Sequence, residues 1–183
     1  MTEGALDALK VEFAQLLNDL TGAHAWAGIG LQQARERWGD ASKIEHPDAD
    51  FFIGHGEPGT PESEAYQRWR QGELPVLLAE NGFVDQFLGN MWVVAVYAYW
   101  EDHYRQRFAE LLGVNKNDVK DPLFGDLRRI RRDIVHNRAV ASPENSGRCE
   151  VLTSWTHVGR TITVGHDQII EFMRRLGLTF RVE

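Results

Sequence analysis

Apolar residues recur with helical spacing along most of the chain. Over residues 4–20, leucine and phenylalanine return every three or four positions, which predicts an amphipathic helix that ends at Thr21-Gly22. Residues 23–38 predict a second helix. Residues 83–112 carry two neighbouring apolar stripes. A helix with so wide an apolar arc is buried on several sides, in the centre of a bundle or also in a dimer interface. The pattern therefore predicts a mainly α fold.

The pattern changes between these helices. Residues 39–65 hold seven acidic residues, one lysine, three prolines and four glycines, a composition that predicts a loop. Thr60, Pro61 and Glu62 then supply a hydroxyl cap, a proline at the first helical position and an acid near the helix N-terminus. We therefore expect a short helix from there to about Gln71.

The C-terminal part differs again. Residues 149–155 and 161–164 resemble two β-strands of a hairpin, and residues 178–182 could form a third strand. Between them, Asp167 is expected to cap a short helix that ends at Gly177. We therefore predict a single domain, a helical bundle with a small C-terminal β-hairpin and helix as an appendage. Its three parts are the N-terminal helices and acidic loop (1–82), the helical core (83–140) and a small α+β tail (148–183).

Composition narrows the classes of protein. The formal net charge is -7 and the pI is near 5.5, which argues against a broadly basic nucleic-acid coat but leaves room for a local basic site. The N-terminus lacks the features of a signal peptide. The longest apolar run, residues 91–100, is half of what a membrane span needs. We therefore expect a cytoplasmic protein that does not bind membranes.

A metal site has little support. His46, Asp48, Asp50 and His55 could be drawn as ligands, but no pair of them stands at i, i+4 on a helix. The lone Cys149 excludes an intramolecular disulfide and a cysteine-based zinc finger. A solvated acidic loop is the simpler interpretation, and we expect neither a metal nor a cofactor.

One predicted helix, residues 127–138, combines an apolar stripe with a basic face. Leu127, Ile130 and Ile134 form the stripe. The opposite face is expected to hold Arg129, Arg132, Asp133 and His136. Five arginines against one aspartate make this segment locally basic in an acidic chain, which usually marks a site that meets an anion. They are Arg128, Arg129, Arg131, Arg132 and Arg138.

The same helix resembles a known family. Residues 131–137 read R-R-D-I-V-H-N, which is similar to the R-x4–6-H signature of HEPN domains, often seen as R-N-D-I-V-H-N. Residues 98–105, A-Y-W-E-D-H-Y-R, carry a second similarity, and the helix order agrees, so the resemblance covers about residues 83–140. HEPN domains are small α-helical units that usually dimerise, and many are metal-independent ribonucleases. The resemblance implies a homodimer that cleaves RNA in a defence, toxin–antitoxin or stress-response setting.

The resemblance also implies roles for residues. The ribose 2′-hydroxyl would attack the adjacent phosphorus, with His136 as general acid or base and Arg131 gripping the phosphoryl oxygens. On a helix, Arg131 and His136 lie roughly 140° apart, so Arg132, one turn before His136, is the better partner by spacing alone. A two-fold dimer could bring either arginine beside the other subunit's histidine.

Several residues are supporting candidates. Asn137 either binds phosphate or caps the helix, and Asp133 is placed among the supporting residues. Glu101 or Asp102 orients a catalytic arginine or histidine, or Glu101 only forms an i, i+4 salt bridge with Arg105. The arginines expected to bind the RNA backbone are Arg128, Arg129 and Arg138.

Two positions depart from the HEPN pattern. Arg132 stands where a small polar residue is common, which supports a catalytically inactive module that binds nucleic acid, a nucleotide or a protein. Arg138 stands where one HEPN subgroup has a tyrosine, so control by nucleotide transfer onto that tyrosine is not supported. A further alternative is the toxin or immunity half of a paired system, in which the acidic loop or the 83–112 helix binds a cognate antitoxin or regulatory protein.

Overall fold

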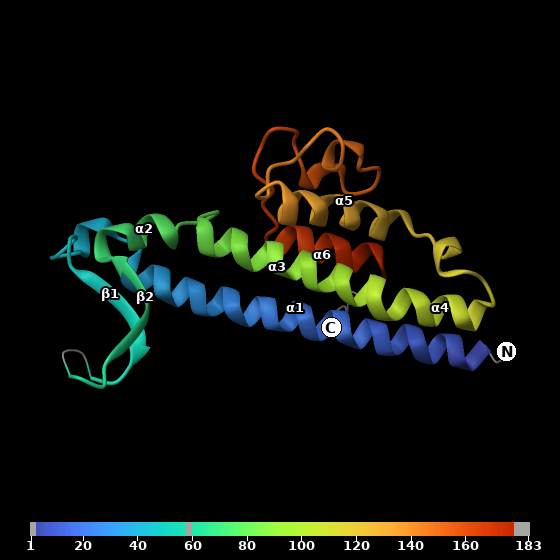
Figure 1. Ribbon diagram of the computed structural model, residues 1–183. Coiled ribbons are helices and arrows are strands. Elements are labelled where there is room, and N and C mark those ends of the chain that lie inside the picture. The colour runs from blue at the N-terminus through green and yellow to red at the C-terminus, as the bar shows by residue number, and fades with distance from the viewer. Residues whose placement is uncertain (1–2, 58–59, 178–183) are drawn as a thin grey trace, which may run out of the picture. The chain divides into compact units, whose positions relative to one another are not determined.

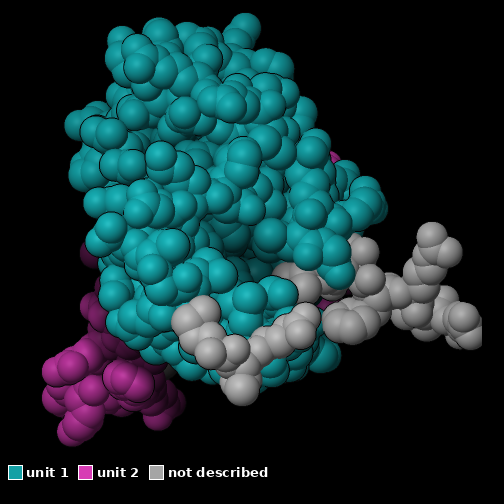
Figure 2. All heavy atoms as spheres, turned by 90° about the vertical axis from the view of Figure 1, so that its right-hand side faces the viewer, with its two compact units in different colours: residues 1–27, 86–183 teal, residues 28–85 magenta. Residues whose placement is uncertain are grey.

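The computed structural model describes residues 3–57 and 60–177, and the chain folds into two compact units. Unit 1 comprises residues 1–27 and 86–183, and unit 2 comprises residues 28–85 (Figure 2). The structure is mainly helical with one small two-stranded sheet, which confirms the predicted fold class in its coarse form. No described helix is long and apolar enough to cross a membrane.

The first helix is longer than predicted. α1 runs without interruption from Glu3 to Trp38, so the predicted break at Thr21-Gly22 is wrong (Figure 1). One glycine inside a helix costs only about 1 kcal/mol. Packing of α1 offsets that cost, because Leu17 is fully buried and the Thr21 hydroxyl accepts a hydrogen bond from Trp92 Nε1 at 3.3 Å.

The predicted 83–112 helix is confirmed, with one irregular turn. It consists of α3 (Phe83–Tyr99), a π-helical turn (Trp100–Tyr104) and α4 (Arg105–Leu112), and Gly113 ends it in the left-handed conformation with φ 69°. A π turn inside an α-helix is rare and is frequently found at functional sites. Here it carries Glu101 and Asp102, two of the candidate residues.

Aromatic side chains hold the core of unit 1 together. Phe13 of α1 contacts Trp100, Tyr104 and Phe124, and Trp100 stacks on Phe124 with ring centroids 4.2 Å apart. Phe124 belongs to α5 (Pro122–His136), whose N-terminus is capped by the Asp121 carboxylate. The π turn is therefore packed directly against the start of the helix that carries the arginine cluster.

The C-terminal segment covers the remaining faces of this core. α6 (His166–Arg175) buries Ile169, Phe172 and Met173, and the predicted helix is confirmed, although Gly165 rather than Asp167 stands at its N-cap. Gly177 follows it with φ 71°. A side chain at Gly89 of α3 would overlap the Val164 backbone, so this segment lies directly on α3. The predicted strand over 178–182 lies outside the described residues.

The predicted C-terminal hairpin is wrong. Residues 149–155 contain one 3₁₀ turn (Thr153–Trp155), and another (Ser146–Arg148) precedes them. Residues 161–164 contribute only an isolated bridge between Thr161 and Val140. Leu152, Trp155, Ile162 and Val164 are buried as their apolar pattern requires. The apolar pattern correctly indicated which residues are buried. The backbone amides of residues 150–152, however, donate to the Asp126 carboxylate on α5 and not to a neighbouring strand.

Unit 2 contains the sheet that the sequence did not predict. β1 (Asp50–His55) pairs antiparallel with β2 (Glu64–Arg70), and α2 (Leu74–Leu77) follows; another 3₁₀ turn precedes α2. The expected loop over 39–65 and the helix to Gln71 are therefore wrong. Strand pairing decides this, because Phe51 pairs with Trp69 across the sheet and packs against Trp38. Thr60 and Pro61 lie in the turn between the strands.

Candidate functional site

A surface depression of about 360 Å³ gathers five of the ten predicted site residues. We call it the arginine depression. It lies between the C-terminal half of α5 and the π turn, with α3 and α4 contributing the ends of its opposite wall. Its lining residues are Tyr97, Glu101, Arg105, Asn117, Arg128, Arg131, Arg132 and His136. The structure thus brings Arg131, Arg132 and His136 to one place, together with Arg128 and Glu101.

The basic side chains that α5 contributes to this depression have no hydrogen-bond or ion-pair partner among the residues that the structure describes. Within the described residues, no hydrogen bond or ion pair engages the guanidinium groups of Arg128, Arg131 and Arg132 or the imidazole of His136. Arg131 is half-buried, whereas Arg128, Arg132 and His136 are exposed. Three unpaired guanidinium groups beside one another repel, so this arrangement favours an anion in the depression.

The helical spacing of Arg131 and His136 does not separate them. They lie about 140° apart around the helix axis, yet both line the depression, and Arg132 lines it as well. His136 is the last residue of α5, where the helix ends and the side chain is open to solvent. The structure therefore places both candidate arginines with the histidine and does not choose between them.

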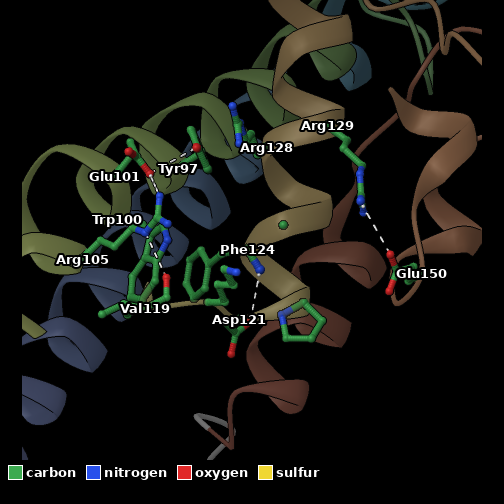
Figure 3. Close-up of a pocket in the computed structure, with 13 residues that line it drawn as sticks. Tyr97, Trp100, Glu101, Arg105, Val119, Asp121, Phe124, Arg128, Arg129 and Glu150 are labelled. Atoms are coloured by element: carbon green, nitrogen blue, oxygen red, sulfur yellow. Dashed lines mark hydrogen bonds and ion pairs between the residues drawn. The ribbon is translucent and has the colours of Figure 1, made fainter. Parts of the chain in front are cut away.

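Glu101 fixes the opposite wall. Its carboxylate accepts hydrogen bonds from Tyr97 Oη at 3.3 Å and Arg105 Nη1 at 2.9 Å (Figure 3). Lys116 Nζ also lies 3.0 Å from this carboxylate. Burial raises the pKa of Glu101, but hydrogen bonds from Lys116 and Arg105 outweigh it and hold the pKa below its ordinary value. The i, i+4 salt bridge weighed in the sequence is present, and Glu101 acts on Arg105 rather than on an arginine of α5.

Asp102 lies elsewhere. It is exposed and lines a different depression, with Ala95, Tyr99 and His103 of the same helical stretch and Leu16 of α1. Glu101 and Asp102 are neighbours in the π turn, but Glu101 lines the arginine depression and Asp102 does not. The structure does not bring Asp102 to the motif residues.

Asp133 is buried on the other flank of α5, contrary to the prediction that it shares the solvent face. Its carboxylate accepts hydrogen bonds from the Ser142 backbone and hydroxyl (both 2.8 Å), from Asn145 Nδ2 at 2.9 Å and from the Ser146 backbone at 3.1 Å. Burial raises the pKa of Asp133, but these hydrogen bonds lower it to about 2. Asp133 therefore holds the loop after α5 in place.

Three further predicted residues are used by the fold or point away. Asn137 is the C-cap residue of α5, and its amide donates to the Val140 carbonyl at 2.6 Å, which agrees with the capping alternative. Arg129 bonds to Asp126 at 2.7 Å and lies 3.6 Å from Glu150. Arg138 is exposed, stands after the helix with φ 50°, and is not among the residues that line the arginine depression.

Sequence reasoning missed Asp126, the counterpart of Asp133. It is fully buried, and one carboxylate oxygen accepts backbone hydrogen bonds from Glu150, Val151 and Leu152 at 2.6–2.9 Å. Asp126 and Asp133 stand seven residues apart, two helical turns along the same flank. We call the pair the aspartate clamp. Two aspartates seven residues apart, next to an apolar stripe, could have indicated from the sequence that both are buried on one flank of the helix.

Tyr97, Arg105 and Asn117 were also missed. Tyr97, Glu101 and Arg105 stand at i, i+4 and i+8, so their common face could have been read from the sequence. That this face meets α5 could not be read from it. Within the described ranges, no group of three or more His, Cys, Asp or Glu side chains is placed to hold a metal ion.

Comparison with known proteins adds no further information on this site. No protein-family model, curated protein or solved structure matches the chain.

Proposed function

We propose that the arginine depression binds the RNA backbone and cleaves a phosphodiester bond without a metal ion. The observation that supports this most is a set of guanidinium groups, from Arg128, Arg131 and Arg132, that have no partner among the described residues and line one depression with the His136 imidazole. The resemblance of residues 83–140 to HEPN domains points to the same reaction, and the helical fold is compatible with it.

The proposed reaction is a transesterification. The ribose 2′-oxygen loses its proton and bonds to phosphorus, the bond from phosphorus to the 5′-oxygen breaks, and that oxygen takes up a proton. His136 either accepts the proton from the 2′-hydroxyl or donates a proton to the leaving 5′-oxygen. Because this position is exposed, water carries out the proton transfer that His136 does not. Arg131 and Arg132 stabilise the charge that grows on the non-bridging oxygens.

The test is incubation of the purified protein with single-stranded RNA in the presence of a chelator. Products should end in a 2′,3′-cyclic phosphate and a 5′-hydroxyl, and a 2′-deoxy nucleotide at the cleaved position should stop the reaction. We expect His136→Ala to slow cleavage by roughly 10²- to 10⁴-fold with RNA affinity retained. Arg131→Ala should slow it by roughly 10²- to 10³-fold. The matched control is His157→Ala, an exposed histidine outside the depression.

Mixing the two inactive variants shows whether the site is shared between chains. Activity restored by mixing Arg131→Ala with His136→Ala means that one subunit supplies the arginine and another the histidine. Absence of restored activity places both residues in one chain. Cleavage at the wild-type rate in His136→Ala, or an absolute need for a divalent metal, contradicts the proposal.

A binding module without catalysis is the second candidate, and one observation favours it. No side chain in the described part of the chain hydrogen-bonds to the His136 ring, whereas a catalytic imidazole is generally oriented by a third group. For such a module, Arg131→Ala weakens RNA binding, His136→Ala changes it little, and RNA incubated with the protein stays intact.

A further inference from the structure

A second pocket adjoins the arginine depression. It has a volume of about 360 Å³ and lies between the π turn and the N-terminal half of α5 (Figure 3). We call it the Gly125 pocket. Pockets of roughly 300–1,000 Å³ hold small molecules or parts of larger ligands. The two hollows have four lining residues in common: Tyr97, Glu101, Arg105 and Arg128.

We propose that the Gly125 pocket receives a nucleobase of the RNA whose phosphate lies in the arginine depression. This inference rests on the proposed function and names the substrate contact that gives it selectivity. Every nucleotide carries its base beside its phosphate, so a backbone held by Arg131 and Arg132 presents a base to the adjoining hollow. Sequence-selective RNA recognition generally uses splayed single-stranded bases held by aromatic and arginine side chains.

The walls of the pocket suit a base. Trp100 and Phe124 line the pocket and make that side of it apolar. Their rings stack on each other and are almost completely buried, so this wall is held firmly in place. Tyr97 and Arg128 stand where the pocket meets the arginine depression. The Arg128 guanidinium has no partner among the described residues, and a planar cation of this kind stacks on a base as well as pairing with phosphate.

The polar side of the pocket is fixed in place before any ligand binds. Arg105 is mostly buried, donates from Nε to the Val119 carbonyl at 3.0 Å and holds Glu101 with Nη1. An ionised carboxylate has about four acceptor positions, and Tyr97, Arg105 and Lys116 use three of those on Glu101. The free one accepts from an exocyclic amino group, so adenine, guanine and cytosine are favoured over uracil, which has none.

Gly125 offers a way to fill the pocket without disturbing the fold. It lies inside α5 and lines the pocket, and a Cβ added there meets no atom within 4 Å. Replacing a helical glycine by alanine or leucine also improves helix propensity. The matched control is Gly22→Leu in α1, where an added Cβ likewise has nothing within 4 Å and the site is not involved.

The experiment measures binding of a fluorescent single-stranded hexanucleotide whose 2′-hydroxyls are replaced by fluorine, so that it cannot be cleaved. In a set of such oligonucleotides, one base at a time is removed to leave an abasic position. For wild-type protein, we expect removal at one position to weaken binding roughly 10-fold. Gly125→Leu should bind the complete oligonucleotide about that much more weakly and be insensitive to base removal there. Gly125→Ala should lie between, and Gly22→Leu should behave as wild type.

The outcomes separate this inference from the proposed function. If oligonucleotides bind in an Arg131-dependent way but Gly125→Leu stays as sensitive to base removal as wild type, the base lies elsewhere and the subsite is wrong. If no oligonucleotide binds to the wild-type protein, the proposed function fails and the subsite fails with it. Equal affinity for uracil and for the three amino-bearing bases at that position contradicts the role of Glu101.

Discussion

The two flanks of α5 satisfy their charges in opposite ways. On one flank, the buried carboxylates of the aspartate clamp accept at least four hydrogen bonds each, mostly from the backbone of residues 142–152. On the other, Arg128, Arg131 and Arg132 line a depression and have no partner in the part of the chain that is described. On this helix, a buried charge serves the fold, whereas charges without a described partner in a surface depression mark the candidate site.

Removing one half of the aspartate clamp should have the largest effect. Asp126→Ala leaves three backbone amides and Arg129 without their acceptor. Each buried donor left unsatisfied costs about 1–3 kcal/mol, so we expect the free energy of unfolding to fall by about 4 kcal/mol. Urea denaturation measures it. The control Glu144→Ala, at an exposed position, should change it by less than about 0.5 kcal/mol. A loss for Asp126→Ala as small as the control's would show that the clamp does not stabilise the fold.

Acid should release the other half of the clamp. Because the folded pKa of Asp133 is lowered to about 2, ionised Asp133 stabilises the protein at every pH above its ordinary value near 3.8. This contribution, about 2 kcal/mol, disappears as pH falls from about 4 to about 2. The measurement is the difference in unfolding free energy between wild type and Asp133→Asn as a function of pH. A difference that stays constant down to pH 2 contradicts the assignment.

The arginine flank should respond to salt and leave stability unchanged. Arg132→Gln removes one charge that meets phosphate, so the slope of log binding constant against log salt should become shallower by about 0.7–0.9. Arg129→Gln serves as the contrast, since Arg129 is tied to Asp126 and Glu150. We expect it to lower the melting temperature and leave the salt slope unchanged. If Arg129→Gln made the salt slope shallower and Arg132→Gln lowered only the melting temperature, the two flanks would not differ as described.

Part of the site could be predicted and part could not. The predicted face opposite the apolar stripe held Arg129, Arg132, Asp133 and His136, and of these only Arg132 and His136 line the arginine depression, together with Arg128 and Arg131. Asp133 was assigned to the solvent face, but it is buried in the aspartate clamp. The sequence pattern showed one apolar stripe on α5 and gave no sign that the segment after the helix covers a second flank. Asp102 was grouped with Glu101 because the two are adjacent in the sequence, but they line different depressions.

Local sequence patterns were enough to predict the long helix over 83–112 with its end at Gly113, the arginine helix, and the apolar helix near the C-terminus. These depend on a local repeat and on caps within one turn. The continuation of α1 through Thr21-Gly22 and the pairing of β1 with β2 depend instead on contacts between distant parts of the chain. The tertiary structure also decided that the π turn faces α5 across the arginine depression. Strand pairing, buried carboxylates and the opposite wall of a hollow depend on partners far along the chain, which no local pattern reports.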